Sequence, residues 1–169
     1  MKTAGMLCLF TACLWIGAAY CRARRQRLAV LRDLCKAMEQ MEGELASRSS
    51  PLPELCRLLA TGSEGDVRAF FTRIADGLAE LGELRFSELW KRAARDTLFC
   101  LRPFEMDALL RLGSSLGRYE LDRQLGVVKA CSRTLERCYR AAQQSMTGEL
   151  KVGMGLAAAA GALLVIAMW

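Results

Sequence analysis

The chain is apolar at both ends and mixed in character between them. Residues 4–20 (AGMLCLFTACLWIGAAY) and 152–169 (VGMGLAAAAGALLVIAMW) contain no charged side chain. Each segment approaches the ~20 apolar residues that a helix needs to cross the hydrocarbon core of a bilayer. The pattern predicts two transmembrane helices, with the charged residues 22–151 forming a domain between them.

Within this middle region, apolar residues recur every three or four positions, which is the period of an amphipathic helix. No proline or glycine separates the first series from the N-terminal apolar segment, so one long helix is predicted to run to about Arg48. From Glu120 onward no proline intervenes, and a second long helix is predicted to continue into the C-terminal apolar segment.

Four shorter helices are predicted between the two long ones. The first starts in residues 50–54, with Ser50 as the expected cap and two prolines in the first turn. Asp66 is the expected cap of the second helix and Ser87 that of the third, which carries Trp90 as a core residue. Pro103 opens the fourth, whose apolar residues are Phe104, Met106, Leu109, Leu110 and Leu112.

The predicted fold class is therefore all-α. We expect a six-helix bundle whose first and last long helices pair antiparallel and continue into N- and C-terminal transmembrane helices. About 130 residues between the apolar ends suffice for one domain and not for two.

The placement of the arginines predicts the orientation of the chain in the membrane. The basic collar, formed by Arg22, Arg24, Arg25 and Arg27, directly follows the first apolar segment, whereas only Lys2 precedes it. Because positive charge stays on the cytosolic side, we expect an integral protein of the cell membrane with residues 22–151 in the cytosol.

The overall charge agrees with this division. The net charge is +6, from 24 basic and 18 acidic residues, and without Lys2 and the collar 19 basic residues face 18 acidic ones. A nucleic-acid-binding protein would spread basic residues over a face with interleaved aromatics, and no such face is evident. Anionic lipid headgroups are the more natural partner of the collar, and nucleic acid is not an expected partner.

A second interpretation of the N-terminal end stays open. Gly17-Ala18-Ala19 resembles the small-residue cleavage site of a signal peptide, and Tyr20-Cys21 resembles a lipoprotein box with a poorly fitting tyrosine. The chain would then be an exported, membrane-anchored helical protein. The basic run RARRQR after the apolar segment opposes export, so a retained transmembrane helix is favoured.

Cysteine and histidine usage argues against disulfide and metal chemistry. Histidine is absent, and the five cysteines of the middle region are scattered with no C-x-x-C pair: Cys35, Cys56, Cys100, Cys131 and Cys138. We expect small buried thiols in a reducing cytosol, with no metal and no other cofactor.

No catalytic motif is present: the sequence lacks GxxxxGK[ST], GxGxxG, G-x-S-x-G and H-E-x-x-H. The apolar ends also lack the ionisable residues that transporters place within the membrane. The sequence therefore predicts a non-enzymatic scaffold protein without catalytic residues.

One charged pattern stands out on the last long helix. The basic stripe, formed by Lys129, Arg133, Arg137 and Arg140, repeats at steps of four, four and three residues. Such a stripe is either a docking surface for an acidic partner or a solvated helix face, and both interpretations stay open.

Residues 31–60 contain a leucine-spaced helix, acidic residues near Glu42–Glu44, and then Ser50 followed by the motif Pro51, Leu52, Pro53 and Glu54. Residues 109–125 contain the glycine-bearing run LGSSLGRYELDRQL. Both stretches resemble the stage III sporulation protein AB family of endospore-forming bacteria, and residues 51–54 are its family-like motif. The resemblance covers nearly the whole chain.

The resemblance implies a helical bundle similar to the cytosolic domains of the platform protein F of type II secretion and type IV pilus systems. It implies a membrane platform in the secretion-like channel complex between mother cell and forespore. A stage III sporulation protein AA-like ATPase is the implied cytosolic partner, beside other subunits of the complex. A platform subunit of a secretion or pilus system stays open as an alternative, as does a homo-oligomer.

Overall fold

The computed structural model describes the backbone of residues 2–47, 51–80, 85–116 and 121–167, and most of the side chains between residues 18 and 145 in these ranges. These residues form six helices and no strand, so the predicted all-α fold is confirmed. The helices are α1 (Lys2–Ser47), α2 (Leu52–Gly62), α3 (Gly65–Glu80), α4 (Phe86–Thr97), α5 (Pro103–Ser115) and α6 (Leu121–Ala167).

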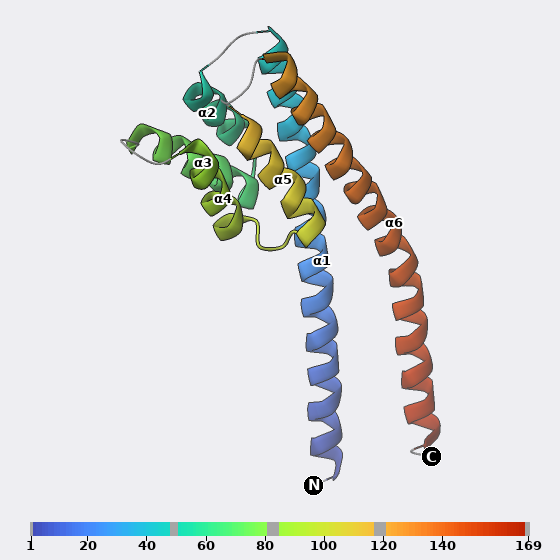
Figure 1. The fold of residues 1–169 in the computed structure, drawn as a ribbon. Helices are drawn as coiled ribbons and strands as arrows, with labels where there is room; N and C mark the ends of the chain where they lie inside the picture. The colour runs from blue at the N-terminus through green and yellow to red at the C-terminus, as the bar shows by residue number, and fades with distance from the viewer. Residues whose placement is uncertain (1, 48–50, 81–84, 117–120, 168–169) are drawn as a thin grey trace.

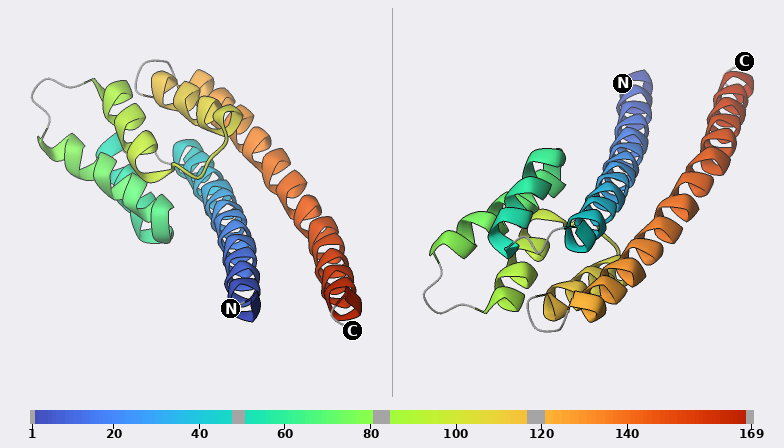
Figure 2. Two further views of the ribbon diagram at one scale, coloured as in Figure 1. Left: turned by 90° about the horizontal axis from the view of Figure 1, so that it is seen from below. Right: turned by 90° about the horizontal axis from the view of Figure 1, so that it is seen from above.

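The two long helices, α1 and α6, contain 46 and 47 residues and run antiparallel (Figure 1). Lys129 Nζ lies 3.4 Å from Glu42 Oε1, which fixes their register near the end of the molecule that is distant from both termini. The N- and C-termini lie at the other end, where the two helices are separated (Figure 1). α2, α3 and α4 lie on one side of α1, and α6 lies on the other (Figure 2).

The predicted transmembrane segments, residues 4–20 and 152–169, fall on the terminal parts of α1 and α6. Most of their side chains lie outside the described residues. Among the described residues, no helix combines the length and the apolar character that a membrane crossing requires.

Trp90 of α4 is fully buried at the centre of the bundle, as the sequence predicts. Its ring packs edge-on against Phe70 of α3, with 4.9 Å between ring centroids. Its indole N–H donates a hydrogen bond of 2.9 Å to the Leu109 carbonyl of α5, so the polar atom of this side chain is satisfied in the core. Gly113 provides the space for the indole, because a Cβ at this position would lie 2.1 Å from Trp90 Cδ1.

The start of α5 at Pro103 is confirmed, but two predicted helix caps are wrong. α4 begins at Phe86, one residue before Ser87, because the extended Arg85 carbonyl already accepts the N–H groups of Glu88 and Leu89. Asp66 lies inside the first turn of α3, where its carboxylate accepts a 2.9 Å hydrogen bond from Gln26 of α1. Ser50 lies outside the described residues.

The short turn from α2 to α3 depends on Gly65. This residue has a φ of +52°, in the left-handed region that favours glycine. Only Ser63 and Glu64 separate the two helices, so the connection between α2 and α3 is two residues long.

Candidate functional site

The basic collar divides into two environments on α1. Arg22 and Arg25 are exposed, whereas Arg24 and Arg27 are partly buried. The Arg24 guanidinium lies 5.0 Å from the centre of the Tyr20 ring, in a cation–π arrangement. Arg27 turns toward α5, so the collar also holds the bundle together.

The partner of Arg27 is Glu105, which is not among the site residues predicted from the sequence. Glu105 is only 1% exposed. Its Oε2 accepts a 3.2 Å hydrogen bond from Arg27 Nε and a 2.8 Å hydrogen bond from the backbone N–H of Arg102, while its Oε1 pairs with Arg27 Nη2. A carboxylate buried to this degree requires such partners, since unpaired burial of its charge is costly.

Helix α6 completes this junction through Cys138. Its own burial, and next the nearby Glu105 carboxylate, raise the pKa of the Cys138 thiol. Glu105 therefore links α1, α5 and α6. The sequence does contain a pattern that marks Glu105 as a residue of a helix start. Pro103 stands at the first helical position and Glu105 follows two residues later, which is typical of a helix start.

A cleft of about 370 Å³ opens beside Glu105, between α1, α5 and α6. We call it the basic cleft because Arg24, Arg27 and Arg102 line it, with Glu105 as its one acidic residue. Phe104 lies at its edge, and α6 contributes only small side chains: Cys138, Ala141, Ala142 and Ser145.

The basic stripe lies along α6 with all four residues exposed. Lys129 pairs with Glu42 of α1, and Arg140 pairs with Glu136 one turn earlier on its own helix. In the described part of the chain, neither Arg133 nor Arg137 has an ion pair. These two arginines are therefore the members of the stripe whose charge is directed to solvent or to a partner.

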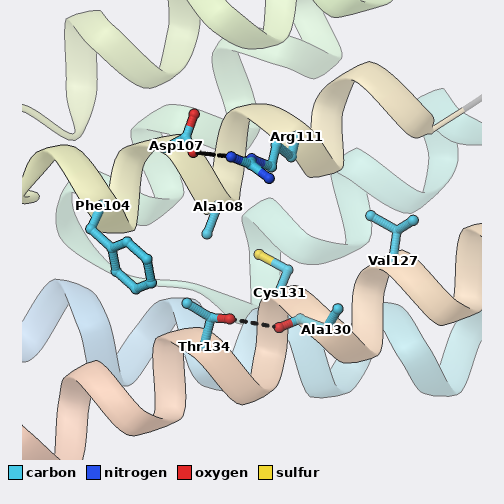
Figure 3. A pocket seen from close by; sticks show the side chains of 8 residues that line it. All are labelled: Phe104, Asp107, Ala108, Arg111, Val127, Ala130, Cys131 and Thr134. Atoms are coloured by element: carbon cyan, nitrogen blue, oxygen red, sulfur yellow. Dashed lines mark hydrogen bonds and ion pairs between the residues drawn. The ribbon is translucent and has the colours of Figure 1, made fainter.

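A groove of about 290 Å³ follows the contact between α5 and α6, next to the stripe (Figure 3). Ala108 of α5 faces Cys131 of α6 across it, and the Phe104 ring lies near Thr134 (Figure 3). The Asp107–Arg111 ion pair, at 2.9 Å, lies along the α5 side. Ala130 and Thr134, which line the groove, lie within one turn of Arg133 and Arg137 on α6, so the groove and these arginines are a candidate surface for a protein partner.

The family-like motif has a structural position. Pro51 is the residue that precedes α2, with extended ψ of 141°, and Leu52, Pro53 and Glu54 form the first turn. The helix that they start buries Leu55, Cys56, Leu59 and Ala60, and α2 packs chiefly on α3. The motif thus sets where α2 enters the bundle.

The described cysteines are free thiols. Burial raises the pKa of both Cys56 and Cys131 to about 12, and burial, followed by the nearby Glu136, raises that of Cys35 to about 11. At neutral pH these groups are protonated, and a protonated thiol is a poor nucleophile and metal ligand. The described residues contain no cluster of three potential metal ligands.

Comparison with known proteins agrees with this architecture. The model of the family "Stage III sporulation protein AB" matches residues 2–169. A protein of that name from Bacillus subtilis (strain 168) is 24% identical over 169 residues, covering 98% of each chain. A solved structure named stage III sporulation protein AB (SpoIIIAB) has the same fold, with a TM-score of 0.65 at 22% identity, over 73% of this chain and 98% of that one. The chain belongs to the stage III sporulation protein AB family.

Proposed function

We propose that this protein is a non-enzymatic membrane platform of the sporulation channel complex between mother cell and forespore. In this proposal the apolar ends of α1 and α6 anchor it in the cell membrane. The bundle lies in the cytosol and presents the free part of the basic stripe to a stage III sporulation protein AA-like ATPase.

The observation that carries the proposal is the register of the two long helices. Lys129 pairs with Glu42, and α1 and α6 advance in opposite directions from this point. Residue 20, where the first uncharged segment ends, is therefore level with about residue 151 of α6, since both helices rise by the same ~1.5 Å per residue. The uncharged segments 4–20 and 152–169 thus occupy matching levels, as two anchors in one bilayer must.

The charge distribution supports the cytosolic orientation. Arg22 and Arg25 are exposed just beyond the first uncharged segment, and Lys151 immediately precedes the second. Both segments thus have basic residues on the side of the bundle, which is the side expected to stay in the cytosol.

Recovery of the ATPase tests the docking part of the proposal. The full-length chain in detergent should retain the ATPase in a pull-down, and Arg133→Glu with Arg137→Glu should weaken this recovery because it reverses two charges at the docking surface. Arg85→Glu with Arg92→Glu is the matched control, since it reverses two exposed arginines, one just before α4 and one on it. Equal recovery of the ATPase with both double variants would show that the basic stripe is not its docking surface.

A further inference from the structure

The basic cleft lies close to the level at which the first uncharged segment ends. Arg24 and Arg27 follow residue 20 by four and seven positions, which corresponds to about 6 and 10 Å along α1. The headgroup layer extends about 5–8 Å from the hydrocarbon core. If α1 is anchored as proposed above, the mouth of the cleft therefore faces the headgroups of the inner leaflet.

The charge of the cleft suits an anion. Arg27 is held by Glu105, so this acidic residue is already neutralised by its own partner. Three arginines and one carboxylate line the cleft, so the formal charge of its lining is positive. Arginine binds phosphate oxygens through paired N–H groups, and a cleft at the cytosolic ends of membrane helices is a favourable place for an anionic headgroup.

The cleft also has room for such a group. Its volume of about 370 Å³ falls within the ~300–1,000 Å³ of small-molecule sites. This space exists because α6 places alanine, serine and cysteine opposite the arginines of α1 and α5.

Two exposed phenylalanines flank Arg102. Phe99, in the loop before α5, is 70% exposed, and Phe104, at the edge of the cleft, is 68% exposed. This loop is on the side of the bundle that faces the terminal parts of α1 and α6 (Figure 1). Exposed aromatic rings beside arginines are costly in water but stable at a lipid interface, where the rings contact acyl chains.

We propose that the basic cleft binds the phosphate of an anionic phospholipid headgroup, with Phe99 and Phe104 inserted beside it. This inference rests on the membrane anchoring proposed above and adds a specific lipid site to it. The bound lipid would fix the tilt of the bundle relative to the membrane, because α1, α5 and α6 all line the cleft.

The test uses the full-length chain in nanodiscs of equal parts phosphatidylcholine and phosphatidylglycerol. Native mass spectrometry after stepwise delipidation should find phosphatidylglycerol retained in preference to phosphatidylcholine. Arg102→Gln should reduce this preference about fivefold, as expected for one arginine near an anionic surface. Arg85→Gln is the matched control because it is likewise an exposed arginine preceding a helix, and it should leave the preference unchanged.

Each alternative result has a distinct meaning. Equal retention of both lipids by an embedded chain would overturn the lipid site and leave the platform proposal intact. A chain that does not enter nanodiscs would overturn both. Displacement of the lipid by millimolar inorganic phosphate would assign the cleft to a soluble anion. Loss of ATPase recovery in Arg102→Gln, with unchanged lipid retention, would assign it to the protein partner.

Discussion

Glu105 and Arg27, 78 positions apart in the sequence, form the ion pair that fastens α5 to α1. Their side chains are only 2% and 16% exposed, respectively. The pair lies between the helices of the bundle and the part of α1 that leads to the first uncharged segment, so it connects the bundle mechanically to the proposed anchor.

Breaking this pair should destabilise the bundle strongly. Arg27→Met leaves the Glu105 carboxylate buried without its charged partner, and we expect a loss of about 3 kcal/mol in the free energy of unfolding. Combining Arg27→Met with Glu105→Leu should recover much of this loss, because no buried charge remains. Chemical denaturation followed by circular dichroism measures both effects.

Arg111→Met serves as the control for this prediction. It breaks the Asp107–Arg111 pair, whose side chains are 57% and 77% exposed, and should cost less than about 1 kcal/mol. A similar cost for Arg27→Met would show that the Arg27–Glu105 pair contributes no more than a surface contact.

Gly113 should not tolerate a side chain. Gly113→Ala places a methyl group against the indole of Trp90, and the overpacked core should lose about 1–3 kcal/mol of stability. Gly126→Ala in α6 is the matched control, since its added Cβ would meet no atom within 4 Å beyond its own helix backbone and chain neighbours. That substitution should stabilise the helix by about 0.5–1 kcal/mol. Thermal unfolding of the two variants should therefore shift in opposite directions, and parallel shifts would contradict the packing described at Trp90.

Cysteine labelling should follow burial. In the folded chain at neutral pH, exposed Cys21 should react with iodoacetamide, whereas buried Cys56 and Cys131 should react only after denaturation. Peptide mass spectrometry identifies the labelled sites. Labelling of Cys56 as fast as that of Cys21 in the folded protein would contradict the described core.

The buried thiols of Cys56 and Cys131 make the free energy of unfolding depend on pH in the alkaline range. Their pKa is about 12 in the folded chain against an ordinary value of 9.0, so above pH 9 the unfolded chain loses protons that the folded chain keeps. The stabilisation is complete below pH 9 and is lost as the pH rises from 9 toward 12. Cys56→Ala should reduce this loss of stability in denaturation curves measured between pH 9 and pH 12. A pH dependence equal to that of the unsubstituted chain would contradict the raised pKa of the Cys56 thiol.

The sequence predicts the helices well because their limits depend on local signals. Pro103 starts α5, and the periodic apolar residues of α1 continue to Leu45, two residues before the helix ends at Ser47. Trp90 is a core residue because a large ring among regularly spaced apolar positions is stable only when buried.

The sequence does not predict contacts that depend on how helices pack. Arg27 was interpreted as one of four equivalent collar residues, because nothing in its neighbourhood identifies a partner 78 positions away. Phe104 belongs to the apolar pattern of α5, yet it is exposed, because it lies on the α5 surface away from Leu109 and Leu112. The prediction that Asp66 caps α3 was wrong because its carboxylate accepts a hydrogen bond from Gln26 of another helix.

The most direct test of the proposed arrangement is protease access in sealed membranes of the native host. We expect residues 22–151 to resist protease added outside intact cells and to be digested in inside-out vesicles, with the chain remaining in the membrane fraction in both. Digestion of the bundle from outside intact cells would contradict the cytosolic platform.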